Sequence, residues 1–118
     1  MPNAVAMTGY GPPKVLRWTR VPLPELGEGQ IRIKVKAAGI SPTDLALRAG
    51  YLKDIPLPPD AVLGFEAAGT VDAVGPGVTG TSTGDAVTAL LVGLGGYAEY
   101  ARQTAGIRTI PVLELRRA

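Results

Sequence analysis

The sequence predicts a mainly β protein, a small barrel or sandwich of short strands with one or two short helices. Sixteen glycines and eleven prolines among 118 residues are too many for long helices and suit a strand-and-turn fold. The apolar residues make up 46% of the chain, enough for a core, and they fall in short runs between Gly/Pro clusters. The length fits a single domain spanning residues 1–118.

The helix is expected over residues 41–50. Ser41 suits the N-cap, Pro42 suits the first helical position, and Gly50 marks the end. The strands are expected on either side of this helix and of the Gly/Pro turns, at residues 5–8, 15–19, 30–37, 65–74, 86–91, 97–101 and 107–112.

The basic residues near the start of the chain do not by themselves indicate a nucleic-acid partner. The net charge is +2, and three of the cations alternate with apolar residues in the run "IRIKVK", residues 31–36. Such alternation is typical of a strand with one buried and one solvated face. We therefore expect the cations to face solvent and expect no nucleic acid as a partner.

The chain has neither cysteine nor histidine. Disulfides, thiolate chemistry, Ser-His and Cys-His catalysis, and the commonest metal ligand are therefore excluded. The longest apolar stretch, around residues 86–94, is too short to span a bilayer, and no signal peptide is apparent. A cytoplasmic protein without a membrane partner is the expectation.

Two glycine patterns imitate a dinucleotide fingerprint. The segment "GPGVTG", residues 75–80, follows a predicted strand but leads into "TSTGD", which favours a turn over the helix that a pyrophosphate site needs. The segment "VGLGGYA", residues 92–98, leaves too few residues after it for a doubly wound sheet. Neither segment predicts cofactor binding, so no cofactor is expected.

Several segments taken together, in order, resemble the medium-chain dehydrogenase/reductase superfamily. They are "MTGYGPPKVLRWTRVPLPELGEGQIRIKVKAAGISPTDLALRAGYL", "PLPPDAVLGFEAAGTVDAVGPGV", "GDAV" and "GGYAEYA". The resemblance runs from about residue 4 to residue 111 and is strongest to the zinc-independent quinone oxidoreductase and enoyl reductase branch. It implies a GroES-like small β-barrel, the first part of that family's catalytic domain.

The resemblance also implies that both catalytic zinc ligands have been lost. Ser41 stands where zinc alcohol dehydrogenases of this superfamily carry a cysteine, and Phe65 stands where they carry a histidine. Serine is a poor zinc ligand and phenylalanine is none, so no metal is expected. Asp44 and Glu66 match the family's helix aspartate and its glutamate. We interpret Glu66 as structural, paired with a nearby arginine, with Arg48 the first candidate.

Family members continue into a nucleotide-binding Rossmann domain, whereas this sequence ends at residue 118. Three functional hypotheses follow. The first is a cofactor-independent, non-redox step such as cyclisation or isomerisation of a polyketide-like substrate. The second is a fragment or subunit of an NADPH-dependent quinone or enoyl reductase, completed by a separate Rossmann domain. The third is a ligand-binding module without catalysis. On the first hypothesis the chain is an enzyme but not a dehydrogenase by itself.

The candidate site follows from the segments where the family places its substrate. Ser41, Asp44 and Tyr51 are the candidate catalytic residues, because they can donate or accept hydrogen bonds. The candidate substrate-binding residues are Leu47, Phe65 and Leu91, although burial statistics also favour a core role for the first two. The expected partner is a hydrophobic small molecule, and the expected assembly is a homodimer that covers exposed sheet edges.

Overall fold

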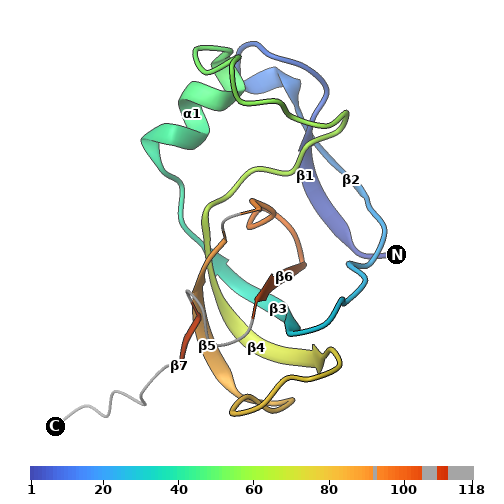
Figure 1. Cartoon of the computed structure of the whole chain (residues 1–118). Helices are drawn as coiled ribbons and strands as arrows, with labels where there is room; N and C mark the ends of the chain where they lie inside the picture. Colours follow the sequence, from blue (N-terminus) through green and yellow to red (C-terminus); the bar gives the residue numbers. More distant parts are fainter. Residues whose placement is uncertain (92, 105–108, 112–118) are drawn as a thin grey trace, which may run out of the picture.

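The computed structural model of the chain describes residues 1–91, 93–104 and 109–111. Strands dominate it, which confirms the mainly β prediction. A two-stranded sheet pairs β1 with β2, and a five-stranded sheet has the order β6-β3-β4-β5-β7, with every neighbouring pair antiparallel (Figure 1). The strands are β1 Asn3–Met7, β2 Leu16–Arg20, β3 Gln30–Ala38, β4 Glu66–Val74, β5 Ala86–Leu90, β6 Tyr100–Thr104 and β7 Thr109–Pro111.

Backbone hydrogen bonds join the two sheets through β1. The Val5 N–H donates to the Tyr97 carbonyl over 2.8 Å, and the Glu99 N–H donates to the Asn3 carbonyl over 3.0 Å. The segment 97–99 leads directly into β6, which pairs with β3. The strand β1 therefore lies between β2 and this segment, and a hydrogen-bonded surface runs from β2 to the five-stranded sheet.

The predicted helix is present as α1, Pro42–Ala49. Ser41 is the N-cap with Pro42 at the first helical position, and Asp44 completes a capping box in which its carboxylate accepts the Ser41 backbone N–H. Gly50 ends the helix at φ 90, in the left-handed region that glycine adopts without strain. A short 3-10 turn, η1 Pro13–Val15, is the second helical piece.

The strand predictions differ from the structure mainly at strand ends. Val15 belongs to η1 rather than to β2. The strand predicted at 97–101 begins only at Tyr100 and continues to Thr104, because residues 97–99 bond to β1 before the chain joins β3. Residues 107, 108 and 112 of the last predicted strand lie outside the described residues.

The apolar interior consists of two clusters. One fills the inner face of the five-stranded sheet and contains Ile31, Ile33, Ala67, Val71, Val87, Ala89, Leu91 and Ala101. The other lies under α1 and joins the helix to β1 and to the segment before β4; it contains Met7, Leu47, Ala61 and Leu63. Figure 1 shows the helix and the β1–β2 pair at one end of the molecule and most of the five-stranded sheet at the other.

The alternation predicted for β3 is confirmed. Ile31 and Ile33 are buried, whereas Lys34 and Lys36 are exposed. Arg32 is half-buried because its guanidinium lies 2.5 Å from the Asp72 carboxylate. Since this ion pair is partly solvated, it contributes at most about 1 kcal/mol to stability. No helix within the described residues reaches the length and hydropathy of a bilayer-spanning segment.

Two glycines allow the segment before β4 and the segment before β6 to cross in direct backbone contact, between the two apolar clusters. The Gly96 N–H donates to the Gly64 carbonyl over 3.2 Å. Gly64 has φ 106, and a Cβ at this position would lie 2.7 Å from the Gly96 Cα, closer than real contacts allow. The backbones at this crossing are therefore in direct contact, with no room for a side chain.

Candidate functional site

A buried carboxylate organises the start of α1. Asp44 is only 1% exposed, yet it accepts four hydrogen bonds. Its Oδ1 accepts the Gly64 N–H over 3.0 Å. Its Oδ2 accepts the Ser41 N–H over 3.1 Å, the Ser41 hydroxyl over 3.2 Å and the Tyr97 hydroxyl over 3.0 Å. These donors compensate the cost of removing a charge from water.

Tyr97 is the most distant partner of this carboxylate along the chain, and sequence analysis did not identify it. Burial, the hydrogen bond to Asp44 and the negative charge of Asp44 together raise the pKa of Tyr97 from 10.0 to about 12, with burial the largest cause. The Tyr97 hydroxyl therefore keeps its proton at neutral pH and acts as a donor. The nearest signal in the sequence is the position of this tyrosine in the segment "GGYAEYA".

The Ser41 hydroxyl is already engaged within the cluster. It donates to Asp44 Oδ2 and accepts the Asp44 backbone N–H over 3.3 Å. A serine hydroxyl has a single proton, so donation to a substrate would require Ser41 to release Asp44. The catalytic roles of Ser41 and Asp44 remain predictions, and the geometry gives both residues a structural role at the helix N-terminus.

The structure does not bring Tyr51 to the other two candidate catalytic residues. Tyr51 follows the C-cap Gly50, and its side chain is 83% exposed. The helix between Ser41 and Tyr51 has eight residues, about 12 Å of rise. Tyr51 and Ser41 therefore lie at opposite ends of α1.

The three candidate substrate-binding residues are divided between the two clusters of the core. Leu47 is 1% exposed in the cluster under α1, and Leu91 is fully buried in the cluster of the five-stranded sheet. Phe65 is half-buried and packs against the cluster that contains Leu47. These side chains serve as core, and a substrate-binding role for them stays a prediction.

The predicted pairing of Glu66 with Arg48 is wrong. The Arg48 guanidinium instead donates to the Gly11 carbonyl over 2.5 Å. Glu66 begins β4 with an exposed side chain and forms no ion pair among the described residues. β4 is an alternating strand, and Glu66 lies on its outer face, opposite Leu90 of β5.

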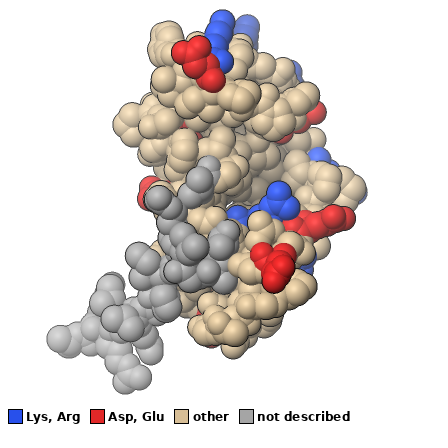
Figure 2. Space-filling view, in the orientation of Figure 1, with Lys and Arg blue, Asp and Glu red and all other residues tan. Residues whose placement is uncertain are grey.

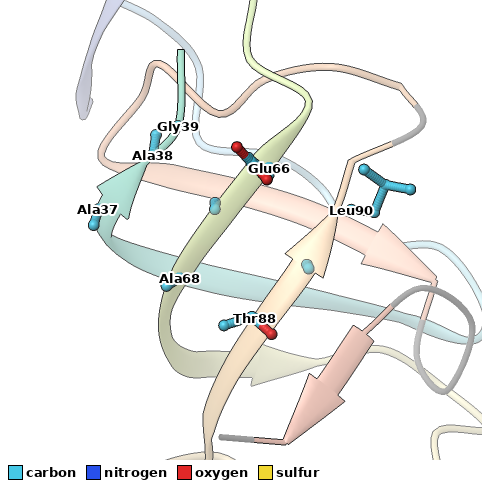
Figure 3. Close-up of a pocket in the computed structure, with 9 residues that line it drawn as sticks. Ala37, Ala38, Gly39, Glu66, Ala68, Thr88 and Leu90 are labelled. Atoms are coloured by element: carbon cyan, nitrogen blue, oxygen red, sulfur yellow. The ribbon is translucent and has the colours of Figure 1, made fainter. Parts of the chain in front are cut away.

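The carboxylate of Glu66 instead lies at an apolar hollow of about 590 Å³ on the outer face of the sheet (Figure 3). The ends of β3, β4 and β5 form this hollow, and it is lined by Ala37, Ala38, Gly39, Glu66, Ala67, Ala68, Thr88, Ala89 and Leu90. Gly39 makes room for the carboxylate, because a Cβ at this position would lie 2.0 Å from Glu66 Oε1. A concave apolar surface with few polar groups is typical of a small-molecule site.

The two glycine patterns do not form a dinucleotide site. Residues 75–80 form the turn between β4 and β5, and residues 93–96 lead through segment 97–99 into β6. The next element among the described residues is a strand in both cases, β5 and β6, so neither turn leads into a helix N-terminus that could hold a pyrophosphate. The described residues therefore do not fit a nicotinamide dinucleotide.

The described residues do not fit zinc either. They contain no group of three or more histidine, cysteine, aspartate or glutamate side chains that could hold a metal ion. Ser41 is bonded to Asp44, and Phe65 has no donor atom. Figure 2 shows acidic and basic side chains interspersed over one face of the molecule, with no large area of a single sign.

The two antiparallel sheets, the capped α1 and the Asp44 cluster define a small β domain of the GroES-like class. Residues 27–112 match the model of the alcohol dehydrogenase GroES-like domain, and the chain belongs to this family, within the medium-chain dehydrogenase/reductase superfamily. This confirms the resemblance drawn from the sequence.

Three similar proteins illustrate the relationship. A quinone oxidoreductase of Lama guanicoe is 39% identical over 102 residues, which are 84% of this chain and 30% of that protein. The crystal structure of the human synaptic vesicle membrane protein VAT-1 homolog-like protein matches with a TM-score of 0.90 and 33% identity, covering 98% of this chain and 37% of that one. The Escherichia coli quinone oxidoreductase complexed with NADPH matches with a TM-score of 0.84 and 29% identity, covering 94% and 33%. The chain thus spans about a third of the length of these relatives.

Proposed function

We propose that this chain supplies the substrate-side domain of an NADPH-dependent quinone reductase. This is the second of the three hypotheses drawn from the sequence. The observation that carries it is the similarity to quinone oxidoreductases over most of the chain. The cofactor-independent cyclisation or isomerisation has no support among the similar proteins, and neither a biosynthetic role nor zinc independence follows from them.

In this proposal the nucleotide-binding domain lies outside the described residues, because those residues do not fit the cofactor. The cofactor, when bound there, supplies the reducing equivalents. The present chain contributes an apolar wall, and the hollow beside Glu66 accommodates the flat ring of the quinone against alanine side chains.

Exposed apolar side chains at this hollow support the idea that another domain covers it. Ile40 directly follows Gly39 and is 73% exposed, and Leu90 lines the hollow and is 44% exposed. Large exposed apolar side chains beside a hollow mark surfaces that other protein segments or ligands cover. In the complete reductase, we expect this rim to lie against the nucleotide-binding domain.

The test compares the chain alone with a chimera that joins it to the remaining part of the Escherichia coli quinone oxidoreductase. The chain alone should neither bind NADPH at micromolar concentration nor oxidise it with 1,4-benzoquinone. The chimera should oxidise NADPH only when the quinone is present. A chimera that folds and binds NADPH but reduces no quinone would contradict the proposal, as would saturable micromolar NADPH binding by the chain alone.

A second comparison tests the hollow itself. The Ala68→Leu variant of the chimera fills the hollow from β4 and should raise KM for the quinone, about tenfold if the ring loses one well-packed contact. Ala86→Leu is the matched control, because Ala86 is exposed on β5 and does not line the hollow. An unchanged KM in Ala68→Leu would place the quinone elsewhere and leave the reductase assignment standing.

A further inference from the structure

The strand β2 is an edge strand with an open outer side. It is bonded to β1 and lies at the end of the two-stranded sheet, and in Figure 1 it lies on the outer side of β1. Four of its five residues are exposed, namely Arg17, Trp18, Thr19 and Arg20. This surface is remote from the hollow beside Glu66, which β3, β4 and β5 form.

The bonds that flank the β1–β2 ladder reveal which backbone groups face outward. The Thr8 N–H donates to the Val15 carbonyl, and the Val21 N–H donates to the Pro2 carbonyl, over 2.9 Å in both cases. In an antiparallel ladder, hydrogen-bonded pairs alternate with pairs that are not bonded to each other. The register between these two bonds therefore gives two further bonded pairs, at residues 6 and 17 and at residues 4 and 19.

Arg17 and Thr19 consequently direct their backbone N–H and C=O groups toward β1, whereas Trp18 and Arg20 direct theirs outward. The opposite edge of β1 is consistent with this register, because Asn3 and Val5 bond to segment 97–99 and the Met7 N–H donates to the Ala61 carbonyl. The outward N–H of Leu16 is already bonded to the Pro13 carbonyl. The N–H and C=O groups of Trp18 and Arg20 therefore form the outer edge of β2, and no described strand pairs with them.

The segment of the chain that contains this edge is basic. Residues 1–24 contain no aspartate or glutamate, whereas Lys14, Arg17 and Arg20 are all exposed. Trp18 lies between the two arginines and is 65% exposed. A basic edge with an exposed aromatic side chain combines a template for strand pairing with a charge preference for the partner.

We propose that the outer edge of β2 binds an extended, acidic peptide segment of a partner protein as an added strand. Main-chain hydrogen bonds to Trp18 and Arg20 would hold the segment, acidic side chains would face Arg17 and Arg20, and an apolar side chain would cover Trp18. A second copy of β2 would bring a second basic edge close to this one, and the like charges repel. A nucleic acid has no strand backbone to pair with the free N–H and C=O groups.

The experiment uses Trp18 as its own reporter, since it is the single tryptophan of the chain. Because Arg17 lies on one face of β2 and Trp18 and Arg20 lie on the other, the probe carries glutamate on both faces. An acetylated eight-residue peptide of glutamate with one central valine is titrated against the protein, and tryptophan fluorescence is followed. We expect saturable binding that weakens as salt rises, because the arginines are exposed and their charges are screened over about 8 Å at physiological ionic strength. The same peptide with lysine in place of glutamate should not bind.

Two variants of one residue separate charge from strand pairing. Arg20→Gln removes the cation and keeps the outward N–H, whereas Arg20→Pro removes both. Proline is tolerated at an edge position whose N–H faces solvent, so the pairing of β2 with β1 should survive in both variants, as circular dichroism would show. We expect Arg20→Pro to bind the acidic peptide about three- to tenfold more weakly than Arg20→Gln, the loss of one hydrogen bond.

Three outcomes would overturn the proposal. The first is a failure of either binding comparison. Arg20→Pro and Arg20→Gln would then bind the acidic peptide with equal affinity, or the unaltered protein would bind the lysine peptide as tightly as the glutamate peptide. The second is tighter binding of an oligothymidine than of the acidic peptide, which would assign the edge to a nucleic acid. The third is a dimer in sedimentation that Arg20→Pro dissociates, which would assign the edge to a second copy. The quinone reductase assay of the chimera is independent of all three.

Discussion

The Tyr97 hydroxyl donates a 3.0 Å hydrogen bond to Asp44 Oδ2 and ties the start of α1 to the segment that leads into β6. Asp44 also holds the backbone of Gly64 through its other oxygen, Oδ1. One buried carboxylate therefore connects the helix, the segment before β4 and the segment before β6. We therefore expect the stability of the site to depend on this connection more than on the helix cap alone.

Replacement of Tyr97 by phenylalanine should lower the free energy of unfolding by about 1–3 kcal/mol, because a hydrogen bond to a charged group is lost and a lone pair of Asp44 is left without its donor. Urea unfolding measures the change. Tyr51→Phe is the matched control, since the Tyr51 side chain is exposed at the far end of α1. Equal, near-zero effects in both variants would contradict the role of Tyr97.

Stability should fall as the pH rises from about 10 to about 12. The folded pKa of Tyr97, about 12, lies above its ordinary value of 10.0, so the folded state retains a proton that the unfolded state loses in this window. The contribution of Tyr97 is thus complete below pH 10 and is lost as the pH passes the folded pKa. Urea unfolding of the protein and of Tyr97→Phe over this range should converge, and parallel curves would count against this assignment.

Asp44→Ala should cost more than the loss of a helix cap. The change removes all four acceptor interactions and leaves the Gly64 N–H and the Tyr97 hydroxyl without partners, so we expect a loss of at least about 2 kcal/mol. Ser41→Ala removes only cap interactions and should cost about 1 kcal/mol. Thermal and urea unfolding measure both, and equal losses would show that Asp44 acts as a cap alone.

Gly64→Ala should be among the most damaging small substitutions in the chain. Both Gly64 and Gly80 have a positive φ, at 106 and 79, but a Cβ meets backbone atoms of Gly96 and Tyr97 only at Gly64. Gly80→Ala therefore measures the conformational strain alone, about 1 kcal/mol. We expect Gly64→Ala to exceed it by at least about 2 kcal/mol in urea unfolding, and similar losses would show that the crossing can widen.

The homodimer expected from the sequence stays a prediction. Light scattering at micromolar concentration should give the mass of two chains, because exposed apolar side chains such as Ile40 and Leu90 need cover when no other domain supplies it. Ile40→Ser together with Leu90→Ser should shift the mass toward one chain. A single-chain mass for the unaltered protein would contradict the expectation.

Local signals predicted the helix and most strands, because their causes lie within a few residues. The cap, the following proline and the terminal glycine of α1 are neighbours in the sequence, and the alternation in β3 is visible in six letters. The predicted ends of strands were less accurate where pairing with a distant strand determines them. Residues 97–99 bond to β1, a partner more than 90 residues away that no local pattern reveals.

The candidate site was only partly predictable for the same reason. The sequence indicated Ser41 as the N-cap and both Ser41 and Asp44 as candidates, but the partners Gly64 and Tyr97 are 20 and 53 residues away from Asp44. The pairing of Glu66 with Arg48 failed because Glu66 is exposed on the outer face of β4, whereas the Arg48 guanidinium donates to the Gly11 carbonyl. The hollow was missed because its lining consists mostly of alanine and glycine, which carry no chemical signature in a sequence.

The contact between Gly64 and Gly96 has a consequence for how the molecule comes apart. This crossing lies between the helical end and the sheet end, and the Asp44 bonds lie beside it. Separation of the two apolar clusters would break this backbone contact and the bond from the Gly64 N–H to Asp44. The two ends should therefore melt together in one cooperative transition despite their separate interiors, with coincident curves for helix and tertiary signals.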